Sequence, residues 1–224
     1  MLKIDVLTLF PKMLEGPLGE SMIRLARKKG LVRIRVHNLR KWTHDRHRTC
    51  DDKPFGGGPG MVMKIEPVYE ALCEIKKKGH VVMLSPRGKP FDHRTAKLLS
   101  KKQHLVFICG HYEGVDERVH RHLIDREISI GDFITTGGEL PTLCVMDAVI
   151  RLIPGVLGNR SSLESESFQN RSLEYPQYTR PFEFRGWGVP ALLRSGVHKK
   201  IAEWRAREAL HLTRRLRPDL LEEK

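Results

Sequence analysis

The chain has 224 residues, 40% of them hydrophobic, which is enough for one large domain or a domain and a half with a buried core. Forty Lys and Arg residues against 27 Asp and Glu give a formal net charge of +13, an excess that attracts polyanions such as nucleic acid or acidic membrane. No apolar run approaches the ~20 residues of a membrane span. The four cysteines form no CxxC pair. We therefore expect a soluble, cytoplasmic protein without a zinc site or a disulfide framework.

Short β-rich segments alternate with segments of helical periodicity through most of the chain. The predicted strands are residues 3–10, 31–39, 80–85, 104–109 and 126–131. The predicted helices are Ser21–Lys29, ended by Gly30, Glu66–Lys78, ended by Gly79, and residues 91–102 and 114–123. Strands that alternate with helices predict an α/β fold with a mainly parallel sheet.

A further helix is predicted from Glu139 to Ile153, with a proline in its first turn and an end before Pro154. Its residues are apolar nearly all round, so it is buried on most sides, against its own core or a second subunit. Asp147 and Arg151 are spaced i, i+4, as in a simple helix ion pair.

Beyond this helix the composition changes. Residues 159–175 are rich in Ser, Asn, Glu and Arg without a hydrophobic period, which is typical of a flexible linker. Residues 176–224 then contain a short and a long helical pattern with many Lys and Arg. The sequence thus predicts an α/β domain over 1–158, a linker over 159–175 and a small basic helical domain over 176–224.

The familiar catalytic and nucleotide motifs are missing. The sequence contains no P-loop, HExxH or GxSxG motif, and the first predicted strand is not followed by GxGxxG. The glycine-rich FGGGPGM follows a polar stretch instead of a strand. His120 and His122 lie two residues apart, on different faces of a helix, and are interpreted as surface residues.

Three loops rich in glycine and proline nonetheless follow predicted strands directly. Their sequences are LSPRGKP (84–90), CGHYEGVDER (109–118) and SIGDFITTGGELP (129–141). In open α/β sheets, ligands bind at the carboxyl ends of the strands. Together these loops could form a pocket for a nucleoside-like molecule, and the alternative is three unrelated surface turns.

Four long motifs carry a resemblance to a known family. THDRHRTCDDKPFGGGPGMVMK, ICGHYEGVDER, ISIGDFITTGGELP and YPQYTRP occur in the same order as in the bacterial tRNA (guanine-N1)-methyltransferases (TrmD), a family of the SPOUT superfamily, and the resemblance extends over essentially the whole chain. It implies a SPOUT fold with a deep trefoil knot, an obligate homodimer with active sites at the subunit interface, and S-adenosylmethionine as methyl donor. It also implies that the acceptor is N1 of the guanosine immediately 3′ of the anticodon, position 37 of tRNA.

The resemblance also assigns donor-binding positions, where glycines suit a site formed largely by main-chain groups. These positions are Leu84, Ser85, Pro86, Gly110, Tyr112, Glu113, Ser129, Ile130, Gly131, Phe133, Thr135, Gly137, Gly138 and Pro141. Phe133 stands where relatives often have tyrosine, so a ring is kept and a hydroxyl is lost.

Methylation of guanine N1 requires a base that removes the N1 proton and a cation near O6, where negative charge develops. The family motif places the base at Glu166, where the usual residue is aspartate, with Glu164 as a second candidate. Without the family, Glu166 would be interpreted as a solvated carboxylate. Arg151 matches the arginine that stabilises O6, and its spacing from Asp147 gives a rival explanation.

Glu113 either neutralises the positive donor or binds Mg²⁺, although no cage of carboxylates is evident. For RNA, the resemblance and the basic composition favour two groups of residues, one beside the GGGPG loop and one in the C-terminal helices. They are Arg46, His47, Arg48, Asp51, Gly60, Lys199, Lys200 and Arg205. For any single cation the alternative is an ordinary solvated surface residue.

Two rival functions remain at this point. One is a SPOUT methyltransferase for another RNA position, and the other is a non-catalytic RNA-binding module, which the glutamate at position 166 favours. A protein of the membrane surface is set aside because the sequence has no amphipathic anchor.

Overall fold

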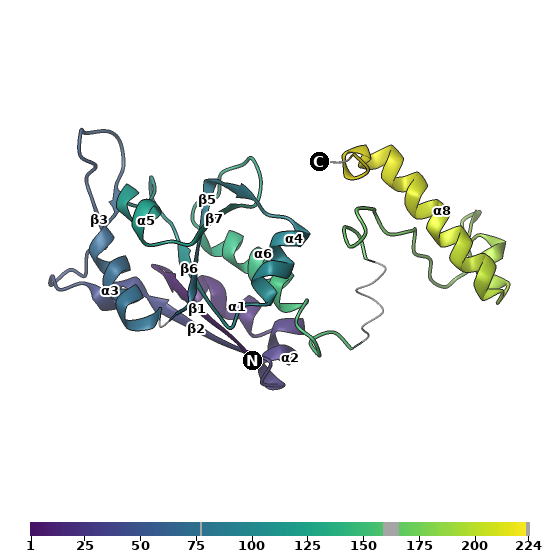
Figure 1. Cartoon of the computed structure of the whole chain (residues 1–224), viewed down its shortest axis with the longest axis horizontal. Coiled ribbons are helices and arrows are strands. Elements are labelled where there is room, and N and C mark those ends of the chain that lie inside the picture. Colours follow the sequence, from purple (N-terminus) through teal and green to yellow (C-terminus); the bar gives the residue numbers. More distant parts are fainter. Residues whose placement is uncertain (77, 159–165, 223–224) are drawn as a thin grey trace. The chain divides into compact units, whose positions relative to one another are not determined.

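The computed structural model of the chain describes residues 1–76, 78–158 and 166–222 (Figure 1). The chain divides into two compact units, Met1–Gly158 and Asn159–Lys224. Among the described residues, no helix combines the length and the apolar character that crossing a bilayer would require.

The first unit is built on a five-stranded sheet in the order β2-β1-β6-β5-β7, and every pairing in it is parallel. Its strands are β1 (Leu2–Thr8), β2 (Val32–Asn38), β5 (His80–Pro90), β6 (His104–Cys109) and β7 (Arg126–Ser129). Each strand predicted from the sequence belongs to this sheet. The expectation of an α/β fold with a mainly parallel sheet is confirmed.

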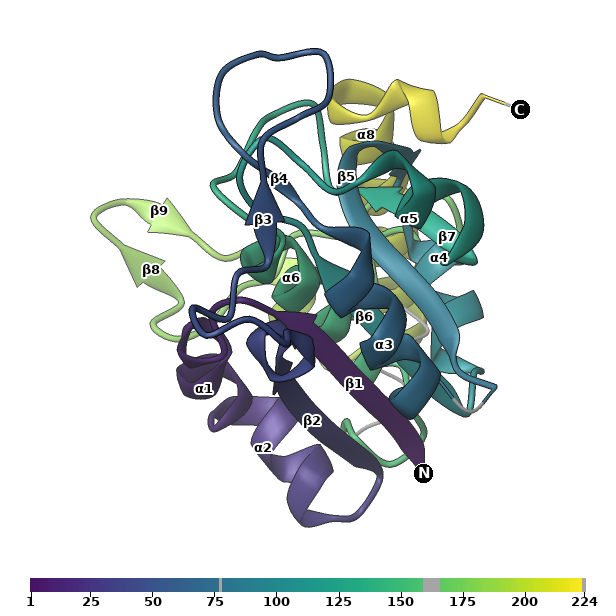
Figure 2. The ribbon, with the colours of Figure 1, turned by 90° about the vertical axis from the view of Figure 1, so that its left-hand side faces the viewer.

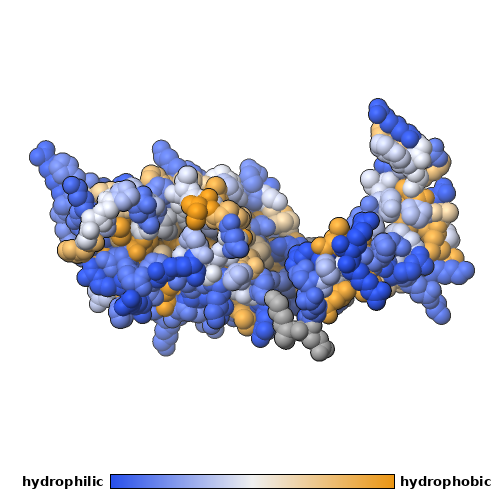
Figure 3. All heavy atoms as spheres, turned by 90° about the horizontal axis from the view of Figure 1, so that it is seen from above, coloured by the Kyte–Doolittle hydropathy of each residue, from blue (hydrophilic) through white to orange (hydrophobic). Residues whose placement is uncertain are grey.

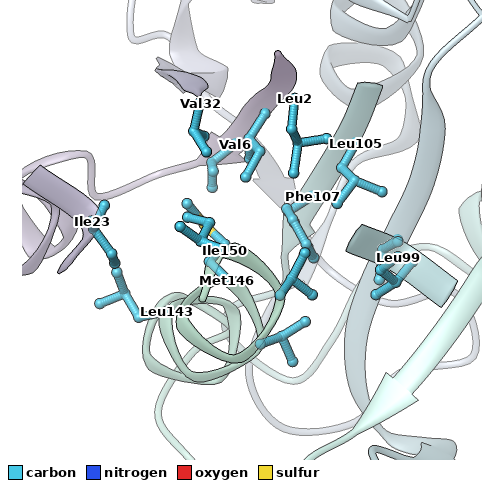
Figure 4. Packing of buried hydrophobic residues seen from close by; sticks show 14 of the residues in the cluster. Leu2, Val6, Ile23, Val32, Leu99, Leu105, Phe107, Leu143, Met146 and Ile150 are labelled. Carbon is cyan, nitrogen blue, oxygen red and sulfur yellow. The ribbon is translucent and has the colours of Figure 1, made fainter. Parts of the chain in front are cut away.

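Helices cover both faces of this sheet, as Figure 2 shows for the first unit. Successive side chains of a strand point to opposite faces, so a doubly covered strand needs apolar residues at nearly every position. In β6, Leu105 and Phe107 pack in one core cluster, whereas Val106 and Ile108 pack in the other. The first cluster lies under α1 (Lys12–Leu18), α2 (Ser21–Lys28), α4 (His93–Ser100) and α6 (Glu139–Ile150) (Figure 4). The second lies under η1 (Leu39–Trp42), α3 (Ile65–Ile75) and α5 (Glu117–His122).

Two helix ends illustrate how local backbone conformation decides a boundary. Gly30 has a φ of +69° and follows α2, as the sequence predicts. The predicted helix Glu66–Lys78 instead ends at Ile75, and Lys78 adopts a left-handed φ of +72°. Gly79 is needed for a different reason: a Cβ there would lie 2.8 Å from His104 Nδ1.

The helix α6 is buried in the core of its own unit, against the sheet and the neighbouring helices. Val145, Met146, Val149 and Ile150 are completely buried. The prediction that this helix is buried on most sides is therefore confirmed. Arg151 forms its C-cap, and the Arg151 amide donates to the Asp147 carbonyl at 3.1 Å.

Asp5 of β1 forms a buried polar bridge across the central strands. Its carboxylate oxygens lie 2.6 Å from His37 Nε2 of β2 and 2.7 Å from His104 Nε2 of β6. Burial raises the pKa of Asp5, but the hydrogen bonds from the two histidines outweigh this effect, so the pKa lies below its usual value.

The second unit contains a long helix, α8, at His198–Leu216, where the sequence predicts one. The short pattern before it forms the 3-10 helix η2 (Ala191–Arg194), and η3 (Pro218–Leu220) follows α8. Strands β8 (Glu183–Phe184) and β9 (Trp187–Gly188) form a hairpin. The Thr213 hydroxyl of α8 accepts from the Leu173 amide at 2.9 Å, which ties the segment before the hairpin to the helix.

Candidate functional site

A cavity of about 530 Å³ opens in the first unit where β5, β6 and β7 end. Because these strands are parallel neighbours, the loops that follow them converge at one edge of the sheet. Every residue predicted to bind the donor lies in the wall of this cavity. The wall consists of Met83–Arg87, Gly110–Val115, His120, Ile128–Gly131, Phe133–Gly138 and Pro141.

The wall formed by β5 depends on an irregularity of the strand. Leu84 and Lys89 both pair with Ile128 of β7, so the four residues between them bulge out of the ladder. Gly88 makes this possible, because a Cβ there would lie 2.4–2.7 Å from backbone atoms of Ile128. The bulge directs Ser85 and Pro86 into the cavity wall.

Glycine is also required for steric reasons at two positions of the segment 129–141. Gly131 has a φ of +150°, and a Cβ on it would lie 2.6 Å from the ring of Phe133. Gly138 packs against the end of β6, where a Cβ would lie 2.8 Å from Cys109 Cα and 2.9 Å from Gly110 N. The Gly138 amide donates to the Gly110 carbonyl at 2.8 Å. Two loops that are remote in sequence are thus held in backbone contact.

Beneath this contact lies a buried carboxylate, Glu139, which begins α6 and is fully buried. The hydroxyl of Thr8 donates to Glu139 Oε1 at 2.6 Å. Glu139 Oε2 and His111 Nδ1 are buried without a hydrogen-bond partner among the described residues. Both atoms lie beside Gly137, because a Cβ on this residue would be 2.4 Å from Glu139 Oε2 and 2.5 Å from His111 Nδ1. The carboxyl group of Glu139 therefore lies close behind the glycine-rich wall.

A second wall of the cavity connects with the predicted RNA loop. Met63 of β4 (Val62–Met63) donates its amide to the Gly114 carbonyl at 2.9 Å, and Glu113 donates its amide to the Met61 carbonyl at 3.0 Å. Gly60, with a φ of +74°, lies directly against the Glu113 side chain.

Tyr112 links the same wall to β3 (Asp51–Asp52). Burial and the nearby charge of Asp51 raise the pKa of the Tyr112 hydroxyl. Arg46, His47 and Arg48 precede this strand and are exposed.

Among the wall residues that were not candidates in the sequence, His120 and Arg87 form ion pairs. The side chain of His120 is only 8% exposed, and its Nδ1 lies 2.9 Å from Glu127 Oε1, so its interpretation as a surface residue is wrong. His122, by contrast, is exposed. Arg87 donates to Glu117 Oε2 at 2.8 Å, and this bond, with that from Arg121, lowers the pKa of Glu117 to about 2. The burial of His120 depends on tertiary contacts with β7, which helical periodicity does not report.

The remaining predicted residues are not brought together in this cavity. Arg151 is half-buried at the end of α6 and does not line the wall. Glu166, Lys199, Lys200 and Arg205 belong to the second unit, and Glu164 lies outside the described residues. Within the described ranges, no group of three or more His, Cys, Asp or Glu side chains is arranged to hold a metal ion.

Comparisons with known proteins agree with the motifs. The family model "tRNA (Guanine-1)-methyltransferase TrmD" matches residues 2–223. Three proteins named tRNA (guanine-N(1)-)-methyltransferase are similar to this chain. That of Dictyoglomus turgidum is 56% identical over 99% of this chain and 91% of its own. That of Carboxydothermus hydrogenoformans is 54% identical over 98% of this chain and 87% of its own. That of Geobacter sulfurreducens is 53% identical over 98% of this chain and 91% of its own. The chain therefore belongs to the tRNA (guanine-1)-methyltransferase TrmD family.

Proposed function

We propose that this protein transfers a methyl group from S-adenosylmethionine to N1 of the guanosine immediately 3′ of the anticodon, position 37 of tRNA. The observation that carries the proposal is the convergence of the three family loops on one cavity at the carboxyl end of the sheet. Family membership identifies the substrate class, and a tRNA substrate favours the cytoplasm. Family membership also favours the SPOUT knot and a homodimer.

The cavity fits the donor in size and chemistry. Its volume of about 530 Å³ falls within the range of small-molecule sites. Its wall combines main-chain groups of glycines with the apolar ring of Phe133, which suits an adenosine moiety. The donor's sulfonium is a cation, and two carboxylates lie at the wall or behind it, exposed Glu113 and buried Glu139. When bound, the donor supplies an electrophilic methyl group for displacement at N1.

The protein must supply a base and a charge partner for the guanine. We propose that Glu166 accepts the N1 proton, a step that typically contributes ~10²–10⁴-fold to the rate. We propose that the guanidinium of Arg151 stabilises the developing charge on O6. Arg151 does not line the donor cavity of the first unit, and Glu166 belongs to the second unit. From the family membership, we infer that the linker of one subunit delivers Glu166 to the donor site of the other.

RNA contacts are proposed for two surfaces. In the first unit, Arg46, His47, Arg48 and Asp51 lie next to the loop that reaches Gly60 and the cavity wall. In the second unit, the cations of α8 would contact phosphates, including Lys199, Lys200 and Arg205. We assign no step to Mg²⁺, because Glu113 contacts the Gly60 backbone and is not part of a cluster of ligands among the described residues.

The test is methyl transfer from labelled S-adenosylmethionine to two tRNA transcripts that differ only in G or A at position 37. Label on the G transcript alone supports the proposal. Label on both means another target nucleotide, and label on neither, with donor and tRNA bound, means a non-catalytic RNA-binding module.

The role of Glu166 is tested separately. We expect Glu166→Ala to bind S-adenosylmethionine like wild type in calorimetry and to lose nearly all turnover. Glu174→Ala, which removes a carboxylate eight positions further along the same segment, serves as the matched control. Wild-type turnover by Glu166→Ala would refute the assignment of the base.

A further inference from the structure

The second unit contains a cleft whose side chains differ from those of the donor cavity. It has a volume of about 550 Å³ and lies between the segment 175–182, the helix η2 and one face of α8. Its wall includes four aromatic residues and three arginines, and none of its lining residues is Asp or Glu. These aromatic and arginine residues are Tyr175, Tyr178, Phe182, Trp204, Arg180, Arg194 and Arg205.

Arginines and rings are paired within this cleft. The guanidinium carbon of Arg205 lies 4.7 Å from the ring centroid of Tyr175, and that of Arg194 lies 5.0 Å from the ring centroid of Phe182. Such cation–π contacts attract the guanidinium to the face of the ring. The cleft therefore presents aromatic rings together with positive charge.

Part of this aromatic surface is open to solvent. Trp204 is only 8% exposed, whereas Tyr178 is 48% and Phe182 60% exposed. The ring of Tyr178 lies 6.4 Å from that of Trp204. In Figure 3, the part of the molecule at the right, which is the second unit by its place in Figure 1, shows apolar side chains among strongly hydrophilic ones. A rim of exposed rings above a buried tryptophan is a surface that a flat ligand could cover.

The charge of the surroundings indicates an anionic ligand. The first turn of α8 contains Lys199 and Lys200 and no acidic residue, although cations at a helix N-terminus oppose the helix dipole. An acidic peptide would need only the arginine forks and would leave the rings unused. A nucleotide uses both, because every base has a face that stacks on aromatic and guanidinium planes and every phosphate pairs with arginine.

We propose that this cleft binds an unpaired nucleotide of the RNA substrate, with its base stacked at Phe182 and Tyr178 and its phosphate at Arg194 and Arg205. The cleft shares no lining residue with the donor cavity. The proposal rests on the proposed function only in taking the RNA to be tRNA.

The test uses the full chain without donor and a fluorescently labelled single-stranded hexaadenylate as the probe. Phe182→Leu keeps an apolar side chain and removes the stacking plane, and Phe182 is exposed enough for folding to be unaffected. We expect about tenfold weaker binding in fluorescence anisotropy, within the range of stacking effects on single strands. Arg194→Lys keeps the positive charge and removes the planar guanidinium. We therefore expect it to weaken the binding of hexaadenylate while the salt dependence of the affinity stays unchanged.

The hairpin β8–β9 offers a matched control. Phe184 is 54% exposed and carries Arg185 at 5.4 Å over its ring, but it does not line the cleft. We expect Phe184→Leu to bind hexaadenylate within twofold of wild type.

Equal effects of the Phe182 and Phe184 substitutions, or equal competition by duplex RNA and by the single strand, would overturn the proposal. Failure of the cleft is distinguishable from failure of the proposed function. If wild type methylates only the G transcript while Phe182→Leu binds hexaadenylate normally, the cleft assignment alone is wrong.

Discussion

Gly138 offers a direct test of how the donor cavity is constructed. Its φ is −80°, an ordinary value for any residue, so a substitution by alanine adds no backbone strain of its own. The added Cβ would instead lie 2.8 Å from Cys109 Cα and 2.9 Å from Gly110 N. Both are backbone atoms at the end of a central strand, and neither can rotate away as a side chain would.

The magnitude follows from two contributions. Forcing an extra carbon into a packed interior costs about 1–3 kcal/mol. The hydrogen bond from the Gly138 amide to the Gly110 carbonyl, now 2.8 Å long, would be stretched, and its loss costs about 0.5–1.5 kcal/mol. We therefore expect Gly138→Ala to lower the free energy of unfolding by about 2–4 kcal/mol, which corresponds to roughly 5–15 °C in Tm.

The assay combines thermal unfolding with calorimetric binding of S-adenosylhomocysteine, because Gly110 and Gly138 both line the cavity. Gly158→Ala is the matched control, since a Cβ there meets nothing within 4 Å. The control should unfold at the wild-type temperature or slightly above it. If Gly138→Ala unfolds and binds like wild type, the close approach of the two loops is not what shapes the site.

Three further predictions concern buried polar groups. Thr8→Val removes the hydroxyl that donates to Glu139, and the buried carboxylate left behind should lower the free energy of unfolding by about 1–3 kcal/mol in urea titrations. Asp5 has a lowered pKa, so its contribution to stability is present above its unfolded pKa of about 4 and is lost as the pH falls through its folded pKa. Asp5→Asn should thus lower the free energy of unfolding at neutral pH and make it fall less steeply as the pH is lowered into the acid range. An unchanged loss of stability in acid would contradict this. Burial raises the pKa of the Cys109 thiol, so iodoacetamide should label exposed Cys73 in the native protein and Cys109 only after unfolding, as read by mass spectrometry.

The strands and the general class of fold could be predicted because their signals are local. The sheet strands stand out as short β-branched runs, and alternation with helices indicates parallel pairing. The strand order could not be read in this way. Nothing local in 84–90 indicates that Leu84 and Lys89 would share Ile128 as a partner. Likewise, Gly79 looks like a helix cap in sequence, whereas in the structure it is required by the proximity of His104.

The site was predictable as a set of loops and less so as a set of side chains. Parallel strands bring their following loops together, so the motifs after β5, β6 and β7 meet whatever their side chains are. His120 shows the limit of this reasoning. Its neighbours in the helix suggest an exposed position, but Glu127 of β7 covers it and makes it part of the wall. Such burial depends on residues that no helical period connects.

The close contacts around its glycines explain why the donor cavity needs so many of them. Gly88 is confined by Ile128, Gly137 by Glu139 and His111, and each neighbour belongs to a different element. A site formed by the approach of several backbones leaves little room for side chains, so its ligand must contact main-chain groups. The cleft of the second unit is built in the opposite way, from long aromatic and cationic side chains on an open surface. The first arrangement suits one small molecule of defined shape, and the second suits a flexible polyanion whose bases can be stacked in more than one way.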